Sequence, residues 1–150
     1  MDYNFWNVMN NKMLGLCIFS CLFAQLLKVI THLVVYKKFD FSRFVETGGM
    51  PSSHSSSVAT LTTCMGLAKG FASCEFAACF IFSFIVMYDA AGVRNEVGIQ
   101  AKILNKIMLK LEKNDQNVGE ELKELIGHTR PQVLVGAILG ILIGVLYIYI

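Results

Sequence analysis

Four long apolar segments limit what this 150-residue chain can fold into. The first, MLGLCIFSCLFAQLLKVITHLVVY at residues 13–36, is long enough to cross a bilayer as a helix. Residues 72–88 and 133–150 are further candidates, and residues 52–71 are a weaker one that begins with Ser and Thr. Because its purely apolar part is short, that weaker segment fits a tilted, a buried or a partly re-entrant helix. With 55% hydrophobic and 16% charged residues, the chain belongs to the membrane class.

A polar insert at about residues 89–132 separates the last two apolar segments. Within it, IQAKILNKIMLKLEK predicts an amphipathic helix, and EELKELIG predicts a shorter one that ends at Gly127. Two sets of side chains recur every four residues in the longer helix: Ile99, Ile103, Ile107 and Leu111, and the basic Lys102, Lys106 and Lys110. The basic stripe suits anionic lipid headgroups or a solvated face equally well. We expect one domain, 1–150, folded as an all-α polytopic membrane bundle of about four spans with this polar helical insert.

The distribution of basic residues predicts the orientation. With four spans, the loops at 37–54 and 89–132 share one side and hold ten of the 13 Lys and Arg residues, whereas the other side holds Lys12 and Lys69. The positive-inside rule places the richer side in the cytoplasm, so we expect an integral protein of the bacterial cytoplasmic membrane. The N-terminal MDYNFWNVMNNK lacks the basic start of a signal peptide.

Several classes of function find no support in the composition. A net charge of +2 gives no indication of nucleic-acid binding. The five cysteines all lie in apolar stretches, without a CxxC motif or a histidine at metal-ligand spacing, as expected of small buried hydrophobes. We therefore expect no metal and no other cofactor. Gly136, Gly140 and Gly144 recur every four residues, which favours close helix packing, and an oligomer through this last helix is conceivable.

The stretch GGMPSSHSSS at residues 48–57 places a histidine at the start of an apolar segment. On the expected topology, His54 and His128 share one membrane face, each beside a helix start. Ser52 and Ser53 suit a helix cap that leaves backbone N–H groups pointing outward, which makes an anion site. Lys28 lies well inside an apolar segment, where an ionisable residue is by default a functional hypothesis. The alternatives are a flexible capped turn and an interfacial His128 with no chemical role.

Three motifs, GGMPSSHS, YDAAGVR and GHTRPQVLVGAILG, occur in this order and together resemble the divergent PAP2 family of small bacterial and plant membrane proteins. That family is itself considered related to acid phosphatases and vanadium-dependent haloperoxidases. The similarity runs from Ala24 through the last helix. It implies a PAP2-like membrane domain with one phosphate site.

The resemblance also implies roles for single residues. The sequence from Pro51 to His54 resembles the Pro-Ser-Gly-His motif of the parent superfamily, which implies that His54 is the general acid. His128 resembles the histidine nucleophile that forms a phosphohistidine, a covalent intermediate that splits one displacement into two. Phosphate-binding roles fall to Lys28, Ser52, Ser53 and Arg94.

The chain departs from the superfamily pattern at two positions around this nucleophile. Gln132 stands where an orienting aspartate is usual, and Leu122 stands where an arginine is usual. Asp89, Arg94 and Arg130 are candidates to supply the missing charges. Two functions follow as hypotheses. One is a membrane phosphatase, a hydrolase acting on a lipid phosphate or small phosphomonoester. The alternative is a non-catalytic protein that binds phosphate or lipid headgroups, or handles lipids.

Overall fold

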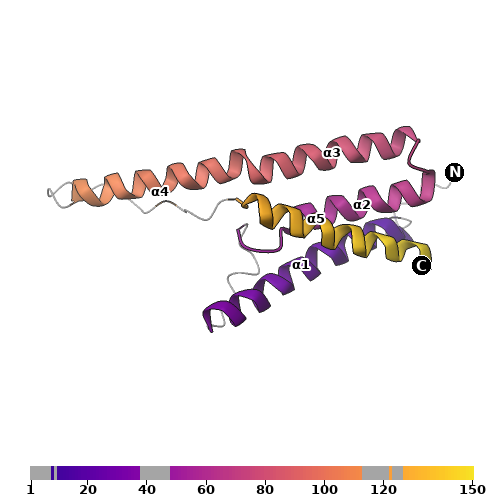
Figure 1. Cartoon of the computed structure of the whole chain (residues 1–150), viewed down its shortest axis with the longest axis horizontal. Coiled ribbons are helices and arrows are strands. Elements are labelled where there is room, and N and C mark those ends of the chain that lie inside the picture. The colour runs from indigo at the N-terminus through magenta and orange to yellow at the C-terminus, as the bar shows by residue number, and fades with distance from the viewer. Residues whose placement is uncertain (1–7, 9, 38–47, 113–121, 123–126) are drawn as a thin grey trace.

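A computed structural model describes residues 8, 10–37, 48–112, 122 and 127–150, and these residues form a helical bundle with one long arm (Figure 1). Apart from turns and short connections, the described residues are helical, as the four apolar segments predict. The elements in chain order are α1 (Lys12–Tyr36), α2 (Ser53–Lys69), α3 (Cys74–Ala91), α4 (Val93–Glu112), α5 (Arg130–Val145) and the 3-10 helix η3 (Leu146–Tyr149). The predicted all-α membrane bundle is confirmed.

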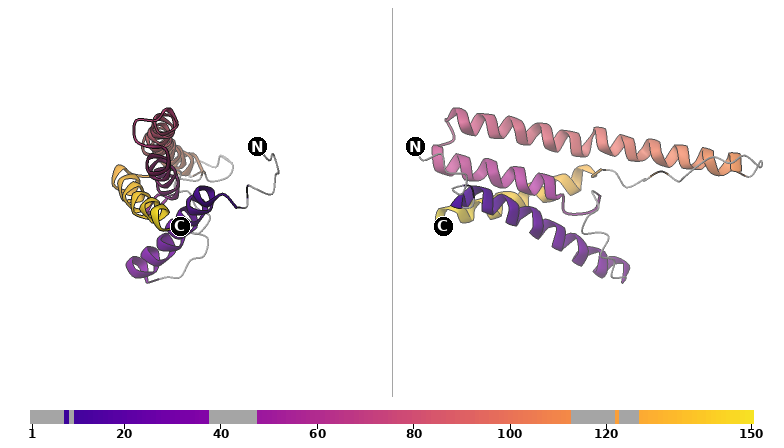
Figure 2. Two further views of the ribbon diagram at one scale, coloured as in Figure 1. Left: turned by 90° about the vertical axis from the view of Figure 1, so that its right-hand side faces the viewer. Right: turned by 180° about the vertical axis from the view of Figure 1, so that it is seen from behind.

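The weak second segment, α2, is the central helix of the bundle. It contacts α1, α3 and α5 along its length, and two views of the bundle show it in their midst (Figure 2). Its hydroxyl groups are satisfied inside the protein: Ser56 Oγ lies 2.6 Å from Ser20 Oγ, and Thr60 Oγ1 donates to the Gly140 carbonyl at 3.0 Å. The structure thus shows this segment as a helix buried among the others.

Three helical stretches are long and apolar enough to cross a membrane, namely Lys12–Val35, Cys74–Leu111 and Arg130–Tyr149. The 17-residue α2 is not among them. Its polar first turns are compatible with a membrane bundle because the other helices cover them.

The glycines of α5 form the surface on which α2 packs. A Cβ at Gly136 or Gly140 would collide with the backbone carbonyl of Ser52 or Ser56, and one at Gly144 would lie 2.6 Å from Thr63 Cβ. The close packing predicted from the four-residue spacing is confirmed, and the partner helix belongs to the same chain. An oligomer through this helix stays a prediction.

Helices α3 and α4 follow one another almost in line, so that α4 extends beyond the rest of the bundle (Figure 1). The Gly92 N–H still donates to the Tyr88 carbonyl at 2.8 Å, and the Glu96 N–H to the Gly92 carbonyl at 3.0 Å. At a rise of about 1.5 Å per residue, the stretch Cys74–Leu111 spans about 57 Å, well beyond a hydrocarbon core of about 30 Å. This helical stretch is therefore longer than one membrane crossing requires.

The polar insert begins within this continuous helical arm. The amphipathic helix predicted from residue 99 onwards starts earlier, at Val93, and its isoleucine stripe is exposed. Asn105 holds the returning chain, because its side-chain amide donates to the Leu122 carbonyl at 2.8 Å and accepts from the Leu122 N–H at 2.9 Å. The second short helix predicted within 120–127 lies outside the described residues except for Leu122 and Gly127.

Candidate functional site

Two histidines that are far apart in the sequence meet at one end of the bundle. The rings of His54 and His128 are edge to face with their centroids 6.4 Å apart. His54 stands in the first turn of α2, and His128 lies just before α5. The α3–α4 junction lies at the same end, opposite the start of α1 and the end of α5 (Figure 1). The expectation that these two histidines share one face agrees with this arrangement.

His128 is buried, with 2% of its surface exposed, and it is held on two sides. Its backbone N–H donates to the Ala90 carbonyl at the end of α3 at 3.0 Å. Its ring Nδ1 lies 3.0 Å from the Gly49 carbonyl oxygen. The other ring nitrogen, Nε2, is buried without a hydrogen-bond partner in the described part of the chain. A buried, unpartnered nitrogen is uncommon, and it marks this side chain as a functional candidate.

Gly127 explains how the backbone brings His128 so close to the arm. Its φ is +151°, and an added Cβ would lie 2.5 Å from the Asn95 nitrogen and 2.6 Å from the Arg94 carbonyl carbon. A side chain at this position would push the segment away from α4. The glycine at the end of the insert therefore determines the depth at which His128 sits.

The surroundings of His128 lower its pKa from 6.5 to about 4. Burial is the largest cause, and the positive charge of Lys28 acts in the same direction. The Gly49 carbonyl and the Gln132 side chain favour the protonated ring, but they do not outweigh the other two. His128 is therefore a neutral imidazole at physiological pH.

Lys28 and Arg94 bring positive charge to the two histidines from different helices. Lys28 is 2% exposed, and an added Cβ at Gly49 would lie 3.2 Å from both its Cγ and its Cδ. Arg94 Nε pairs with Asp89 Oδ2 at 2.6 Å, with both side chains partly exposed. Lys28, Arg94 and Asp89 all act electrostatically on His54. The structure thus gathers these predicted residues into one polar cluster.

Ser52 is engaged in the protein's own hydrogen bonds. Its Oγ accepts from the Ser55 N–H at 3.3 Å and from Ser55 Oγ at 2.9 Å, while its N–H donates to the Gln132 carbonyl at 3.2 Å. Ser56 N–H is also used, by the Ser52 carbonyl. Of the first-turn N–H groups, those of Ser53 and His54 have no intrahelical partner. Ser52 therefore shapes the turn, and the amides of the next two residues are those that the helix itself leaves unused.

Gln132 and Arg130 occupy the first turn of α5. Gln132 Oε1 accepts from the Thr129 N–H at 3.0 Å and completes a capping box with Thr129. Arg130 is exposed, and no contact among the described residues joins it to the cluster. The residue in the usual aspartate position thus has a structural task.

Gly49 was not singled out from the sequence, although the Gly-Gly pair before Met-Pro is a signal for unusual backbone geometry.

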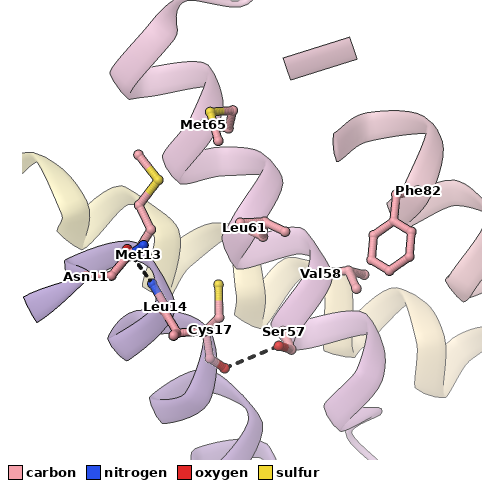
Figure 3. Close-up of a pocket in the computed structure, with 9 residues that line it drawn as sticks. All are labelled: Asn11, Met13, Leu14, Cys17, Ser57, Val58, Leu61, Met65 and Phe82. Atoms are coloured by element: carbon pink, nitrogen blue, oxygen red, sulfur yellow. Dashed lines mark hydrogen bonds between the residues drawn. The ribbon is translucent and has the colours of Figure 1, made fainter. Parts of the chain in front are cut away.

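An apolar groove of about 390 Å³ lies along α2 between α1 and α3 (Figure 3). Ser57, Val58, Leu61 and Met65 line it and lie three, four, seven and eleven residues after His54, so they share its helix face. Its other walls come from α1 and α3, including Met13, Cys17 and Phe82. The groove therefore begins one helical turn after His54, and its apolar lining suits a hydrocarbon chain. No group of three potential metal ligands was found among the His, Cys, Asp and Glu side chains of the described residues.

Comparisons with known proteins agree with the motifs. The sequence profile of the Divergent PAP2 family matches residues 9–143. The chain is 37% identical over 141 residues to YuiD of Bacillus subtilis (strain 168), described as an uncharacterized membrane protein, covering 87% of this chain and 89% of the relative. No solved structure matches the chain.

Proposed function

The chain belongs to the divergent PAP2 family, and we propose on this premise that it is a membrane phosphatase acting on a lipid phosphate or small phosphomonoester through a phosphohistidine. The observation that carries the proposal is the buried His128, whose Nε2 is unpartnered and whose ring faces that of His54. The low pKa of His128 keeps its ring neutral, and a neutral ring has the lone pair that a nucleophile requires.

In the first step, the Nε2 lone pair of His128 attacks phosphorus. The P–N bond forms as the P–O bond to the alcohol breaks, and His54 donates its proton to the departing oxygen. Lys28, Arg94 and the first-turn amides of α2 hold the phosphoryl oxygens, whose charge they stabilise in the transition state. A bound phosphate dianion also offsets the effect of Lys28 and Arg94 on His54, which favours the protonated imidazole that an acid needs.

In the second step, water attacks the phosphohistidine. His54, now neutral, accepts a proton from that water, the P–N bond breaks, and inorganic phosphate and free His128 are released. The two steps together consume one ester and one water and return both histidines to their starting protonation states. The chain's own residues supply every group in this scheme.

The groove that begins at Ser57, one turn of α2 after His54, suggests how a lipid phosphate could be told from a soluble one. A lipid phosphate would place its headgroup in the cluster and a hydrocarbon chain along Val58, Leu61 and Met65. A water-soluble phosphomonoester would use the cluster alone. A chain-length series of phosphate esters separates these cases, because a groove contribution lowers KM as the chain lengthens.

Phosphate release by the purified protein in lipid nanodiscs tests the activity. The panel comprises isoprenoid phosphates, phosphatidic acid, phosphatidylglycerol phosphate and an aryl phosphate, each with wild type, His128→Ala and the control His32→Ala in α1. We expect release by wild type and the control and its loss in His128→Ala. Release at the wild-type rate by His128→Ala would exclude the assigned nucleophile.

One observation favours the alternative, a non-catalytic binder of phosphate or lipid headgroups. Among the described residues, no carboxylate is hydrogen-bonded to His128: Gln132 is uncharged and its Oε1 also caps Thr129, and Asp89 pairs with Arg94. On this account, wild type binds vanadate or phosphate but releases none from esters, and Gln132→Asp confers hydrolysis. Wild-type turnover would refute it.

We propose that the cluster faces the cytoplasm of a bacterium, on the basis of the basic residues at that end. Cys74 begins α3 at the opposite end of the bundle and is exposed. We expect a membrane-impermeant maleimide to label Cys74 in intact cells, whereas a cysteine introduced by Lys102→Cys in a Cys74→Ser background should require lysis. The reverse pattern would invert the orientation.

A further inference from the structure

The ring orientation of His128 depends on a backbone group that the sequence pattern does not reveal. Gly49 presents its carbonyl oxygen 3.0 Å from His128 Nδ1, across 79 residues of sequence. A carbonyl oxygen can only accept a hydrogen bond, so Nδ1 carries the hydrogen. In a neutral imidazole the lone pair then lies on Nε2, the nitrogen without a partner.

Gly49 is itself held in place from two directions. Its φ of +93° lies in the region that glycine adopts readily and other residues rarely do. The stem of Lys28 packs against it, so an added Cβ would lie 3.2 Å from two carbons of that side chain. The next residue is tied to the same helix, because Thr31 Oγ1 donates to the Met50 carbonyl at 3.0 Å. Helix α1 therefore fixes the direction of the Gly49 carbonyl.

The candidate side chains do not put a carboxylate on Nδ1 of the histidine. Gln132 is uncharged and its Oε1 accepts from Thr129 N–H, while Asp89 Oδ2 is paired with Arg94. The Gly49 carbonyl is the group in hydrogen-bond contact with Nδ1. In Ser-His-Asp enzymes, a carboxylate at the equivalent nitrogen selects the tautomer, and its loss reduces turnover strongly.

We propose that Gly49 is a positioning residue whose backbone carbonyl takes the place of an orienting carboxylate and holds His128 in the Nδ1–H tautomer. The catalytic consequence rests on the proposed phosphatase function, whereas the tautomer itself does not. A neutral carbonyl selects the tautomer without adding the negative charge that would stabilise an imidazolium. Lys28 from α1 and His54 from α2 act electrostatically on the His128 ring, and Asp89 from α3 and Arg94 from α4 act on His54 beside it.

Nitrogen-15 NMR of protein labelled in its three histidines, in lipid nanodiscs, reads the tautomer directly. His32→Gln and His54→Gln variants assign the signals. We expect His128 to show a protonated Nδ1 and an unprotonated Nε2 between pH 6 and 8. A protonated Nε2 in wild type overturns the proposal, whether or not the protein hydrolyses any ester.

Gly49→Ala tests the cause of that tautomer, and Gly70→Ala is its matched control. Gly70 has a similar φ of +88°, stands at the other end of α2, and has open space for a Cβ. Both variants carry the backbone cost of alanine at positive φ. We expect Gly49→Ala to give mixed His128 tautomers and at least a tenfold lower kcat with little change in KM, and Gly70→Ala to give neither.

Three further outcomes have defined meanings. A folded Gly49→Ala protein with an unchanged His128 spectrum overturns the proposal. An altered spectrum without phosphate release from any variant supports the positioning role and refutes the phosphatase. If Gly49→Ala does not fold, the wild-type spectrum decides, because the proposal requires the Nδ1–H form.

Discussion

Among the described residues, buried polar groups are fully hydrogen-bonded around the middle of α2, whereas one of them lacks a partner near its N-terminal end. In the middle, Ser20, Ser56 and Thr60 are fully buried, and their hydroxyls bond to one another and to the Gly140 carbonyl. At the N-terminal end, His128 is equally buried but leaves Nε2 without a partner. The same bundle therefore satisfies its buried hydroxyls in one place and leaves one buried ring nitrogen without a partner in the other. A buried polar atom without a hydrogen-bond partner therefore indicates a functional site more strongly than a buried polar atom that has one.

Disrupting the packed middle should have the largest effect on the bundle. In Gly140→Leu the new side chain collides with the Ser56 carbonyl and cannot be accommodated without separating α5 from α2. We expect a fall in Tm of about 10 °C or failure to assemble, measured by circular dichroism in nanodiscs. Gly15→Leu, on the open side of α1, is the control. Equal stability of both variants would show that the α2–α5 contact is not as close as described.

Removing the charge of Lys28, near the N-terminal end of α2, should change ligand binding at the site more than the stability of the bundle. In Lys28→Met we expect phosphate or vanadate affinity to fall at least tenfold, since a charged hydrogen bond is lost. Lys28 lowers the pKa of His128, so its removal raises that pKa, and the acidic limb of the kcat/KM profile moves to higher pH. A limb that stays in place or moves to lower pH contradicts this electrostatic account.

A mild change in the packed middle should have the smallest effect. Thr60→Val removes a hydroxyl that bonds to Ser20 and to two backbone carbonyls, at a cost of about 1 kcal/mol. We expect Tm to fall by a few degrees while vanadate affinity, measured by calorimetry, stays unchanged. Loss of vanadate binding would mean that the two regions are coupled.

The packed region was more predictable from the sequence than the site. The spacing of Gly136, Gly140 and Gly144 predicts a close helix contact, because a helix face without side chains lets the backbone of a second helix approach it. The apolar segments likewise predict the helices. The boundary between α3 and α4 was less predictable, since hydropathy changes at Asp89 while backbone hydrogen bonding continues across Gly92.

The site depends on contacts that no local pattern encodes. Motifs single out His54, His128 and Lys28, but the Gly49 carbonyl reaches His128 through the tertiary fold. Ser52 and Gln132 were expected at the phosphate or in support of it, and both are found in capping bonds. A polar residue beside a helix start is compatible with either task, and the choice depends on which neighbours the fold provides.

Trapping the covalent intermediate tests the central claim, that the free Nε2 of His128 is a nucleophile, most directly. Wild type, His54→Ala and His128→Ala in nanodiscs would be mixed with a phosphorus-32-labelled ester from the panel, quenched within milliseconds to seconds, and examined for protein-bound label. We predict acid-labile, base-stable label on His128 in wild type and none in His128→Ala. Phosphate release by wild type without labelled protein, or undiminished label in His128→Ala, would contradict the account.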